Sequence, residues 1–187
     1  VFGSKLYSEN IVSVSKYSNK IKEDYSIEFE SEKSEYHALS RASVTDLSFR
    51  SNWKYKLMKN WNIEYGGLAS SLLYEPYYYS MYPDPVYESS SQFHSEEAAF
   101  YLENKILLAS FLTINPSVRF VHFKNGDFSL NTFEPRLTME IKLPGSQVLN
   151  MNYQKVTQNT HLVFANGAFF KQEIWLPASK EVPPQTC

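Results

Sequence analysis

The sequence predicts an all-β fold, an antiparallel up-and-down meander, and three observations lead to this prediction. Apolar and polar residues alternate with a period of two along most of the 187 residues, which places them on opposite faces of strands. Aromatic residues make up 16% of the chain, with 14 Tyr and 13 Phe, and aromatic side chains favour strands. Short connections also alternate with longer ones, as they do in membrane β-barrels.

The alternation predicts about eight strands. They are expected at residues 1–14, 23–35, 46–57, 61–73, 96–106, 111–123, 133–143 and 147–161. The clearest is 133–143, in which one face carries Leu137, Met139, Ile141 and Leu143 and the other carries Arg136, Thr138, Glu140 and Lys142. The least clear are 1–14 and 96–106, and the Glu, Ala and Leu residues of 96–106 also suit a short helix.

The connections between these segments differ in length. Tight turns are expected at 57–61, 107–110 and 144–146, the last with a Pro-Gly turn signal, and a modest connection is expected at 15–22. Longer loops are expected at 36–45, 74–95, 124–132 and 162–186. Antiparallel order places the turns near Asn60 and Gly145 at one end of the sheet and the loops 74–95 and 162–186 at the other.

Two kinds of sheet produce such alternation. In a soluble sheet the apolar face packs on a core, whereas in a membrane barrel it contacts lipid and the polar face lines the lumen. Charged side chains recur along the polar faces, and strands of ten or more residues exceed the usual globular length. Aromatic residues also gather around one tight turn: Trp53, Tyr55, Trp61 and Tyr65. These details favour the barrel, which predicts Arg136, Thr138, Glu140 and Lys142 on the concave side and Leu137, Met139 and Ile141 toward lipid.

Composition excludes several classes of protein. The 18 Lys and Arg against 20 Asp and Glu give a net charge of -2, so we expect no nucleic acid partner that binds through bulk charge. The chain lacks a run of about 18 apolar residues, which excludes a membrane-spanning helix. The single cysteine, Cys187, excludes an intramolecular disulfide and a paired-cysteine zinc site. Val1 starts within a strand-like segment, so we expect a piece of a longer chain.

The last third of the chain carries a family resemblance. A strand opens with Glu134, Pro135 and Arg136, and a tight turn leads to a second strand that ends in Gln158, His161 and Leu162. A loop then follows with Ile174, Trp175, Pro177, Lys180, Pro184 and Gln185. This order resembles the late barrel region of TonB-dependent outer-membrane receptors of the Bacteroidetes type.

Two upstream segments are also similar to this family. Residues 46–67 resemble its Asp-led strand, turn and return strand, and residues 96–106 resemble its E-A-x-Y-I-E-D-E strand. The resemblance covers 46–186, and residues 1–45 share only the pattern. The chain departs from the family at residues 171–173 and at Pro116, which stands mid-strand where the family usually has Gly.

The resemblance implies a fold and a function. Residues 1–187 would be a fragment of the barrel domain, without the plug domain, in a Gram-negative outer membrane. The parent protein would bind and import a scarce nutrient, namely a ferric chelate, cobalamin or an oligosaccharide. Its implied partners are outer-membrane lipid, the rest of its own barrel and plug, TonB, and a surface lipoprotein over the loops. The alternative is a soluble β-sandwich or small barrel that binds carbohydrate or another small ligand.

Motifs for catalysis or metal binding are absent from the sequence. His37, His94, His122 and His161 are scattered, without an HExxH motif, and neither a nucleophile elbow nor a phosphate-binding loop occurs. We therefore expect no enzyme, no catalytic residue, no metal site and no cofactor. Three carboxylates on one strand face, Glu28, Glu30 and Glu32, are interpreted as a solvated surface.

Aromatic residues in the predicted loops are the candidate ligand-binding residues. Tyr77, Tyr78 and Tyr79 form a run, with Tyr82 and Tyr87 nearby, and such rings could stack on a sugar or an aromatic chelate. Trp175, in the last predicted loop, is a further candidate. Packing of these rings against neighbouring loops remains the alternative to ligand contact.

Overall fold

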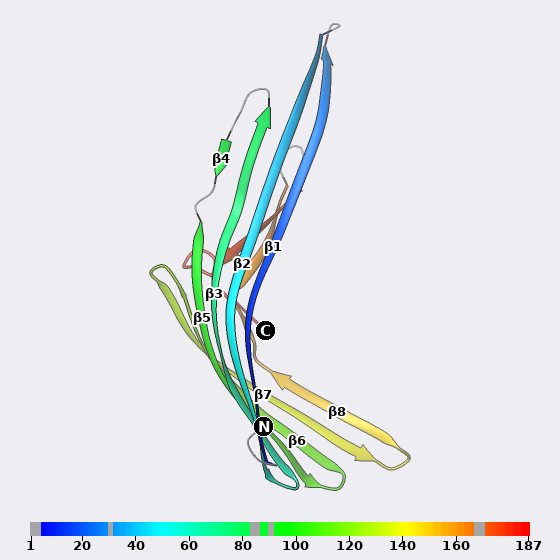
Figure 1. Ribbon diagram of the computed structural model, residues 1–187. Helices are drawn as coiled ribbons and strands as arrows, with labels where there is room; N and C mark the ends of the chain where they lie inside the picture. Colours follow the sequence, from blue (N-terminus) through cyan, green and yellow to red (C-terminus); the bar gives the residue numbers. More distant parts are fainter. Residues whose placement is uncertain (1–4, 30–31, 83–86, 90–91, 167–170) are drawn as a thin grey trace.

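The main feature of the fold is one antiparallel meander sheet that curls into a half-barrel (Figure 1). The computed structural model describes residues 5–29, 32–82, 87–89, 92–166 and 171–187. Within these ranges all regular elements are strands, and the sheet order is β1-β2-β3-β5-β6-β7-β8. This confirms the predicted all-β, up-and-down class. The described residues contain no helix long and apolar enough to cross a membrane.

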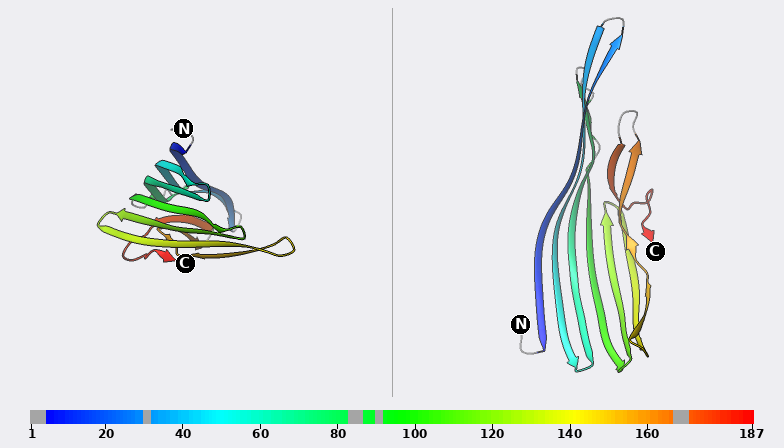
Figure 2. Two further views of the ribbon diagram at one scale, coloured as in Figure 1. Left: turned by 90° about the horizontal axis from the view of Figure 1, so that it is seen from below. Right: turned by 90° about the vertical axis from the view of Figure 1, so that its right-hand side faces the viewer.

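The strands of the sheet are long at its start and shorter toward its end. They are β1 (Leu6–Phe29), β2 (Glu32–Met58), β3 (Trp61–Tyr82), β5 (Phe93–Ala109), β6 (Leu112–Asn125), β7 (Phe128–Leu143) and β8 (Gln147–Gln154). A short β4 (Tyr87–Ser89) pairs with β3. The β1–β2 pair therefore rises above the other strands, as Figure 2 shows in its right-hand view.

The C-terminal segment forms two further pairs of its own. Strand β10 (Thr160–Asn166) pairs with β11 (Lys171–Pro177), and β9 (Thr157–Gln158) pairs with β12 (Gln185–Thr186). Neither pair joins the ladder of the main sheet in the part of the chain that the structure describes. The predicted strand 147–161 is thus too long, since β8 ends at Gln154 and the chain leaves the sheet edge there.

Several predicted connections are strand. Residues 15–22 and 36–45 belong to β1 and β2, whose register runs without a gap from Leu6↔Tyr55 to Phe29↔Glu32, and residues 74–82 belong to β3. The predicted connection at 15–22, which would divide 1–14 and 23–35 into two strands, is therefore wrong. These segments carry polar residues on both faces, so apolar and polar residues do not alternate in them. The backbone hydrogen bonds between the strands nevertheless continue through them. Segment 96–106 is strand, and the helical alternative is wrong.

The turns lie where they were predicted. The connections at 59–60, 110–111 and 144–146 share one end of the sheet, because each follows a strand that runs in the same direction (Figure 1). Gly145 adopts a φ of 79°, in the left-handed region that glycine tolerates best. Strand β3 ends at the opposite end of the sheet, where the segment 74–95 was predicted to lie. Residues 162–186, predicted as a loop, instead contain most of β10 together with all of β11 and β12.

The register assigns each residue to one of two faces. Glu9, Asn52, Gly66, Tyr101, Arg119 and Glu134 form one cross-strand row on the concave face. The next row, on the convex face, is Asn10, Ser51, Gly67, Phe100, Phe120 and Phe133. By the same register Arg136, Thr138, Glu140 and Lys142 lie on the concave face, and Leu137, Met139 and Ile141 on the convex face, as predicted.

Candidate functional site

The concave face carries a charged cluster on three neighbouring strands. Arg119 of β6 lies directly opposite Glu134 of β7, and their ladder places Glu97 and Arg136 within reach. The Arg119 Nη2 atom lies 2.9 Å from Glu97 Oε1, and Arg119 Nη1 lies 3.9 Å from Glu134 Oε2. Arg136 Nη2 lies 3.5 Å from the same Glu134 oxygen. Two carboxylates and two guanidinium groups therefore balance each other on this face.

Glu134 is the centre of this cluster. Its side chain is fully buried, and its Oε1 atom accepts the backbone N–H of Thr157 at 2.8 Å. Asn159 donates to Glu97 Oε2 at 3.2 Å, so the C-terminal segment is attached to the cluster twice. A buried carboxylate is stable only when its oxygens are paired and hydrogen-bonded, which these contacts provide.

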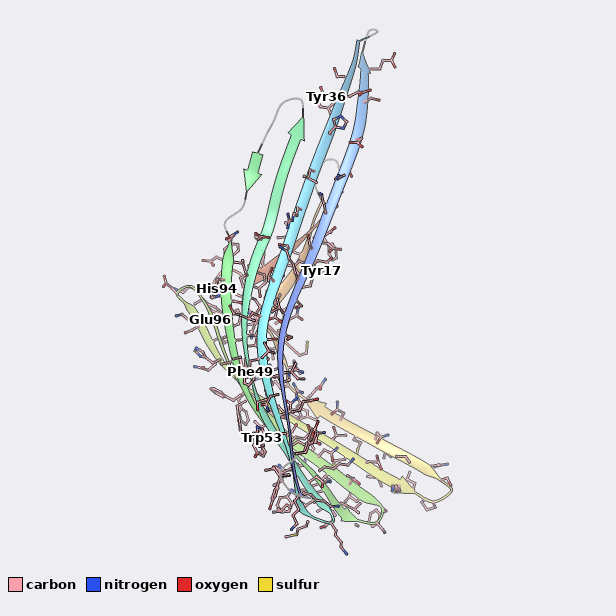
Figure 3. All side chains as sticks on the ribbon, in the orientation of Figure 1. Tyr17, Tyr36, Phe49, Trp53, His94 and Glu96 are labelled. Carbon is pink, nitrogen blue, oxygen red and sulfur yellow. The ribbon has the colours of Figure 1, made fainter. Side chains whose placement is uncertain are left out.

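An aromatic and polar group lies farther along the same face. The fully buried Tyr74 shares a hydrogen bond of 2.7 Å between its hydroxyl and the hydroxyl of Thr160. Tyr17 donates a hydrogen bond to Glu173, and this bond is the main reason that the pKa of Tyr17 lies above its usual value. The rings of Tyr17 and Trp175 meet edge to face, with centroids 5.5 Å apart (Figure 3 labels Tyr17). Among the described residues, side-chain contacts such as these hold β10 and β11 against the concave face.

Trp175 is therefore placed differently from the prediction. It lies within β11, not in a loop, and it packs on Tyr17, which was not among the predicted site residues. Within the described part of the chain its buried Nε1 atom has no hydrogen-bond partner. These contacts agree with the alternative that the Trp175 ring packs against neighbouring parts of the chain. Ligand contact by Trp175 stays a prediction.

Tyr77, Tyr78 and Tyr79 lie in β3, not in a loop. Tyr78 and Tyr79 pair with Arg41 and Ser40 of β2, and on their other side with β4. The side chains of all three tyrosines, and those of Tyr82 and Tyr87, lie outside what the structure describes. Their proposed stacking role stays a prediction.

The convex face carries a broad apolar band. Its exposed members include Phe100, Phe120 and Phe133, which form one row and are 55%, 49% and 60% exposed. Along β7 the band runs from Phe133 to Leu143, which is roughly 33 Å of strand. A strand tilt of about 40° reduces this to about 25 Å in height, the height of the apolar band of a transmembrane barrel.

Aromatic side chains gather at the turn end of this band, as predicted. Trp53 and Tyr65 are cross-strand partners whose rings stack with centroids 6.3 Å apart and planes 6° apart (Figure 3 labels Trp53). The indole N–H of Trp53 donates to Ser51 at 2.9 Å, and that of Trp61 donates to Asn104 at 3.0 Å. Each ring therefore presents apolar surface outward while its polar atom is satisfied within the sheet.

A polar group lies on β2 and β3 beyond the band. Glu75 accepts a hydrogen bond from the buried Ser43 and one from Gln92, and the Lys16 ammonium lies 3.9 Å away. The Ser43 hydrogen bond is the main reason that the pKa of Glu75 is lowered. Charge is therefore present on this part of the sheet, where the apolar side chains have ended.

The histidines do not converge. His94 pairs with Ser71, His122 with Asn131, and His37 with Asp24, at 2.9, 2.8 and 2.7 Å. His161, in β10 of the C-terminal segment, is buried. Across the ranges that the structure describes, no three His, Cys, Asp or Glu side chains lie close enough to hold a metal ion.

Comparisons with known proteins identify no family for this chain. No model of a known protein family matches this chain, and no curated protein matches it either. The family resemblance seen in the sequence therefore stays a prediction.

Proposed function

We propose that this chain is a section of a transmembrane β-barrel of the TonB-dependent receptor type, which imports a scarce nutrient across a Gram-negative outer membrane. The observation that carries the proposal is the separation of the two faces. Large apolar side chains are exposed on the convex face at the same heights where charged side chains line the concave face.

The cost of charge in lipid supports this orientation. A Lys or Arg that faces lipid at mid-depth costs about 2–4 kcal/mol. Along the band the cations occupy concave positions: Lys54, Lys56, Lys105, Arg119 and Arg136. Among the described convex positions of the band, between the row of Leu112 and Ile141 and the row of Phe100 and Phe133, no side chain is charged.

The open edges support a larger barrel. Strands β1 and β8 stand at the two ends of the sheet order, so each pairs on one side only among the described residues. Unpaired edges expose backbone N–H and C=O groups, which cannot be satisfied in a lipid environment. The proposal assigns further strands of the same barrel to these edges and a plug domain to the lumen. TonB would act on that plug, and a surface lipoprotein would cover the loop end.

The soluble alternative requires the opposite orientation. A soluble sandwich or small barrel buries its apolar face and exposes its polar face to water. In residues 136–154 the apolar strand positions other than Val148 lie on the convex side, with Leu137 and Met151 37% and 42% exposed. This orientation supports the membrane proposal over the soluble one.

Lipid contact tests the proposal directly. In the full-length protein with Cys187 replaced by Ser, single cysteines at Leu137, Met139, Thr138 and Glu140 carry an environment-sensitive dye. After assembly into bilayers, spin-labelled lipid should quench the dyes at Leu137 and Met139 strongly, and those at Thr138 and Glu140 weakly. Equal quenching at neighbouring positions would contradict the proposal, because strand residues of a spanning barrel alternate between lipid and lumen.

A further inference from the structure

The C-terminal segment, of which the structure describes residues 155–166 and 171–187, closes on itself through its own backbone. Val156 and Cys187 exchange two backbone hydrogen bonds, both of 3.0 Å. Between these two residues β9 pairs with β12, and β10 pairs with β11. The segment is therefore held together as one unit.

This unit crosses the concave face from one side of the sheet to the other. Strand β11 lies against β2, β3 and β5. Neighbouring strands are about 4.8 Å apart, so the six strands from β1 to β7 in the sheet order span about 24 Å. One side chain from each of five of these strands contacts the unit: Glu134 of β7, Asn125 of β6, Glu97 of β5, Tyr74 of β3 and Tyr17 of β1. The segment thus joins strands that lie far apart in the curved sheet.

The contact between the segment and the sheet excludes water. Tyr74, Ser95 and Glu134 of the concave face are fully buried, and so is Ala178 of the segment. His161 of β10 is buried as well. Removing the Tyr74 ring and Ala178 from water is favourable in the absence of lipid. These contacts can therefore form before the convex face meets a membrane.

We propose that the C-terminal segment acts as a brace, which holds β1 to β7 in their curved arrangement before the barrel closes. Tyr17 and Glu134 lie toward the two ends of the arc, and both contact the same unit. Flattening the sheet would move Tyr17 away from Trp175 while Glu134 stays attached, so the ring contact stabilises the curved form. The brace rests on the proposed function, because it requires further strands to close the barrel around this arc.

The rate of barrel assembly tests the brace. The full-length protein is refolded from urea into vesicles of dilauroylphosphatidylcholine, and the folded barrel is detected by its altered mobility on an unheated gel. Tyr17→Ala removes the ring contact with Trp175 and the hydrogen bond to Glu173, and it should slow assembly by about fivefold. Trp175→Ala should slow assembly similarly. The two changes together should slow it no more than either change alone, because they remove the same contact.

Two further variants keep the result decisive. Tyr17→Phe retains the ring and loses only the hydrogen bond to Glu173, so its assembly rate should lie between those of the wild type and Tyr17→Ala. Tyr7→Ala is the matched control, since Tyr7 lies on the same face of β1, about 33 Å from Tyr17 along the strand. The two tyrosines are 43% and 46% exposed, so they differ chiefly in contact with the segment. Tyr7→Ala should assemble at the wild-type rate.

Two results would overturn the brace. One is equal assembly rates for Tyr17→Ala and Tyr7→Ala. The other is a further slowing when Trp175→Ala is added to Tyr17→Ala, because the two rings would then act separately. If the dye at Leu137 is quenched by lipid while Tyr17→Ala assembles normally, the brace fails alone. If that dye is not quenched, the proposed function fails, and the brace, which requires a barrel to close, fails with it.

Discussion

The concave and convex faces share one set of backbone ladders but satisfy their side chains in different ways. On the concave face, Arg119 pairs with both Glu97 and Glu134, and the C-terminal segment adds hydrogen bonds to both carboxylates. On the convex face, neighbouring positions such as Phe120 and Phe133 stay exposed. The charged groups of this concave cluster therefore find their partners within the chain. The convex side chains, in contrast, are suited to an apolar environment that the described residues do not supply.

The largest expected effect comes from placing a charge on each face in turn. Leu137→Arg should destabilise the assembled protein by about 2–4 kcal/mol, because its convex position would put a guanidinium group in lipid. Thr138→Arg, one residue along on the concave face, should cost less than about 0.5 kcal/mol, as surface substitutions usually do. Urea unfolding of the full-length protein in lipid vesicles measures both. Equal losses would remove the distinction between the faces.

The next effect tests whether the concave face depends on its charges. Glu134→Gln keeps the shape of the side chain and an oxygen for Thr157, but it removes the charge that faces Arg119 and Arg136. Hydrogen bonds to charged groups contribute about 1.5–3 kcal/mol, so we expect a loss of about 2 kcal/mol in the free energy of unfolding. Combining it with Arg119→Met should cost less than the sum of the two single changes. Full additivity would show that the cluster is not coupled.

A pair of glycines provides a smaller and closely matched test. A Cβ atom on Gly66, on the concave face, would lie 2.4 Å from the Ser51 carbonyl oxygen and 2.7 Å from the Tyr101 ring. A Cβ on Gly67, on the convex face, would meet only the Ala99 oxygen, at 3.4 Å. Gly66→Ala should therefore cost about 1–3 kcal/mol through overpacking, and Gly67→Ala much less. Thermal unfolding of both variants under one set of conditions measures the difference, and a larger loss for Gly67→Ala would contradict it.

The sequence predicted the sheet where local pattern and packing agree. Alternation from Arg136 to Leu143 assigned both faces, and Pro144-Gly145 marked its turn, because these signals are local. The extension of β1 through 15–22 was missed, since its polar residues carry no alternation and its order depends on pairing with β2. The contact of Tyr17 with Trp175 joins residues far apart in the chain, and no local signal predicts which distant segment a ring will meet.

The smallest expected effect concerns Glu75, at the place where the apolar band has ended. Its pKa is lowered, mainly by the Ser43 hydroxyl and further by Lys16, so the folded state binds a proton less readily than the unfolded chain. The stabilisation is present above the unfolded pKa of about 4.3 and is lost as the pH falls through the lower folded value. Because the carboxylate is 39% exposed, water screens this contribution to well below about 1 kcal/mol. Unfolding free energies of the wild type and Ser43→Ala, measured between pH 6 and pH 3, should differ most at the higher pH and converge at the lower. A gap that stays constant with pH would assign the effect to the lost packing of Ser43, and the charge at the limit of the band would then contribute nothing to stability.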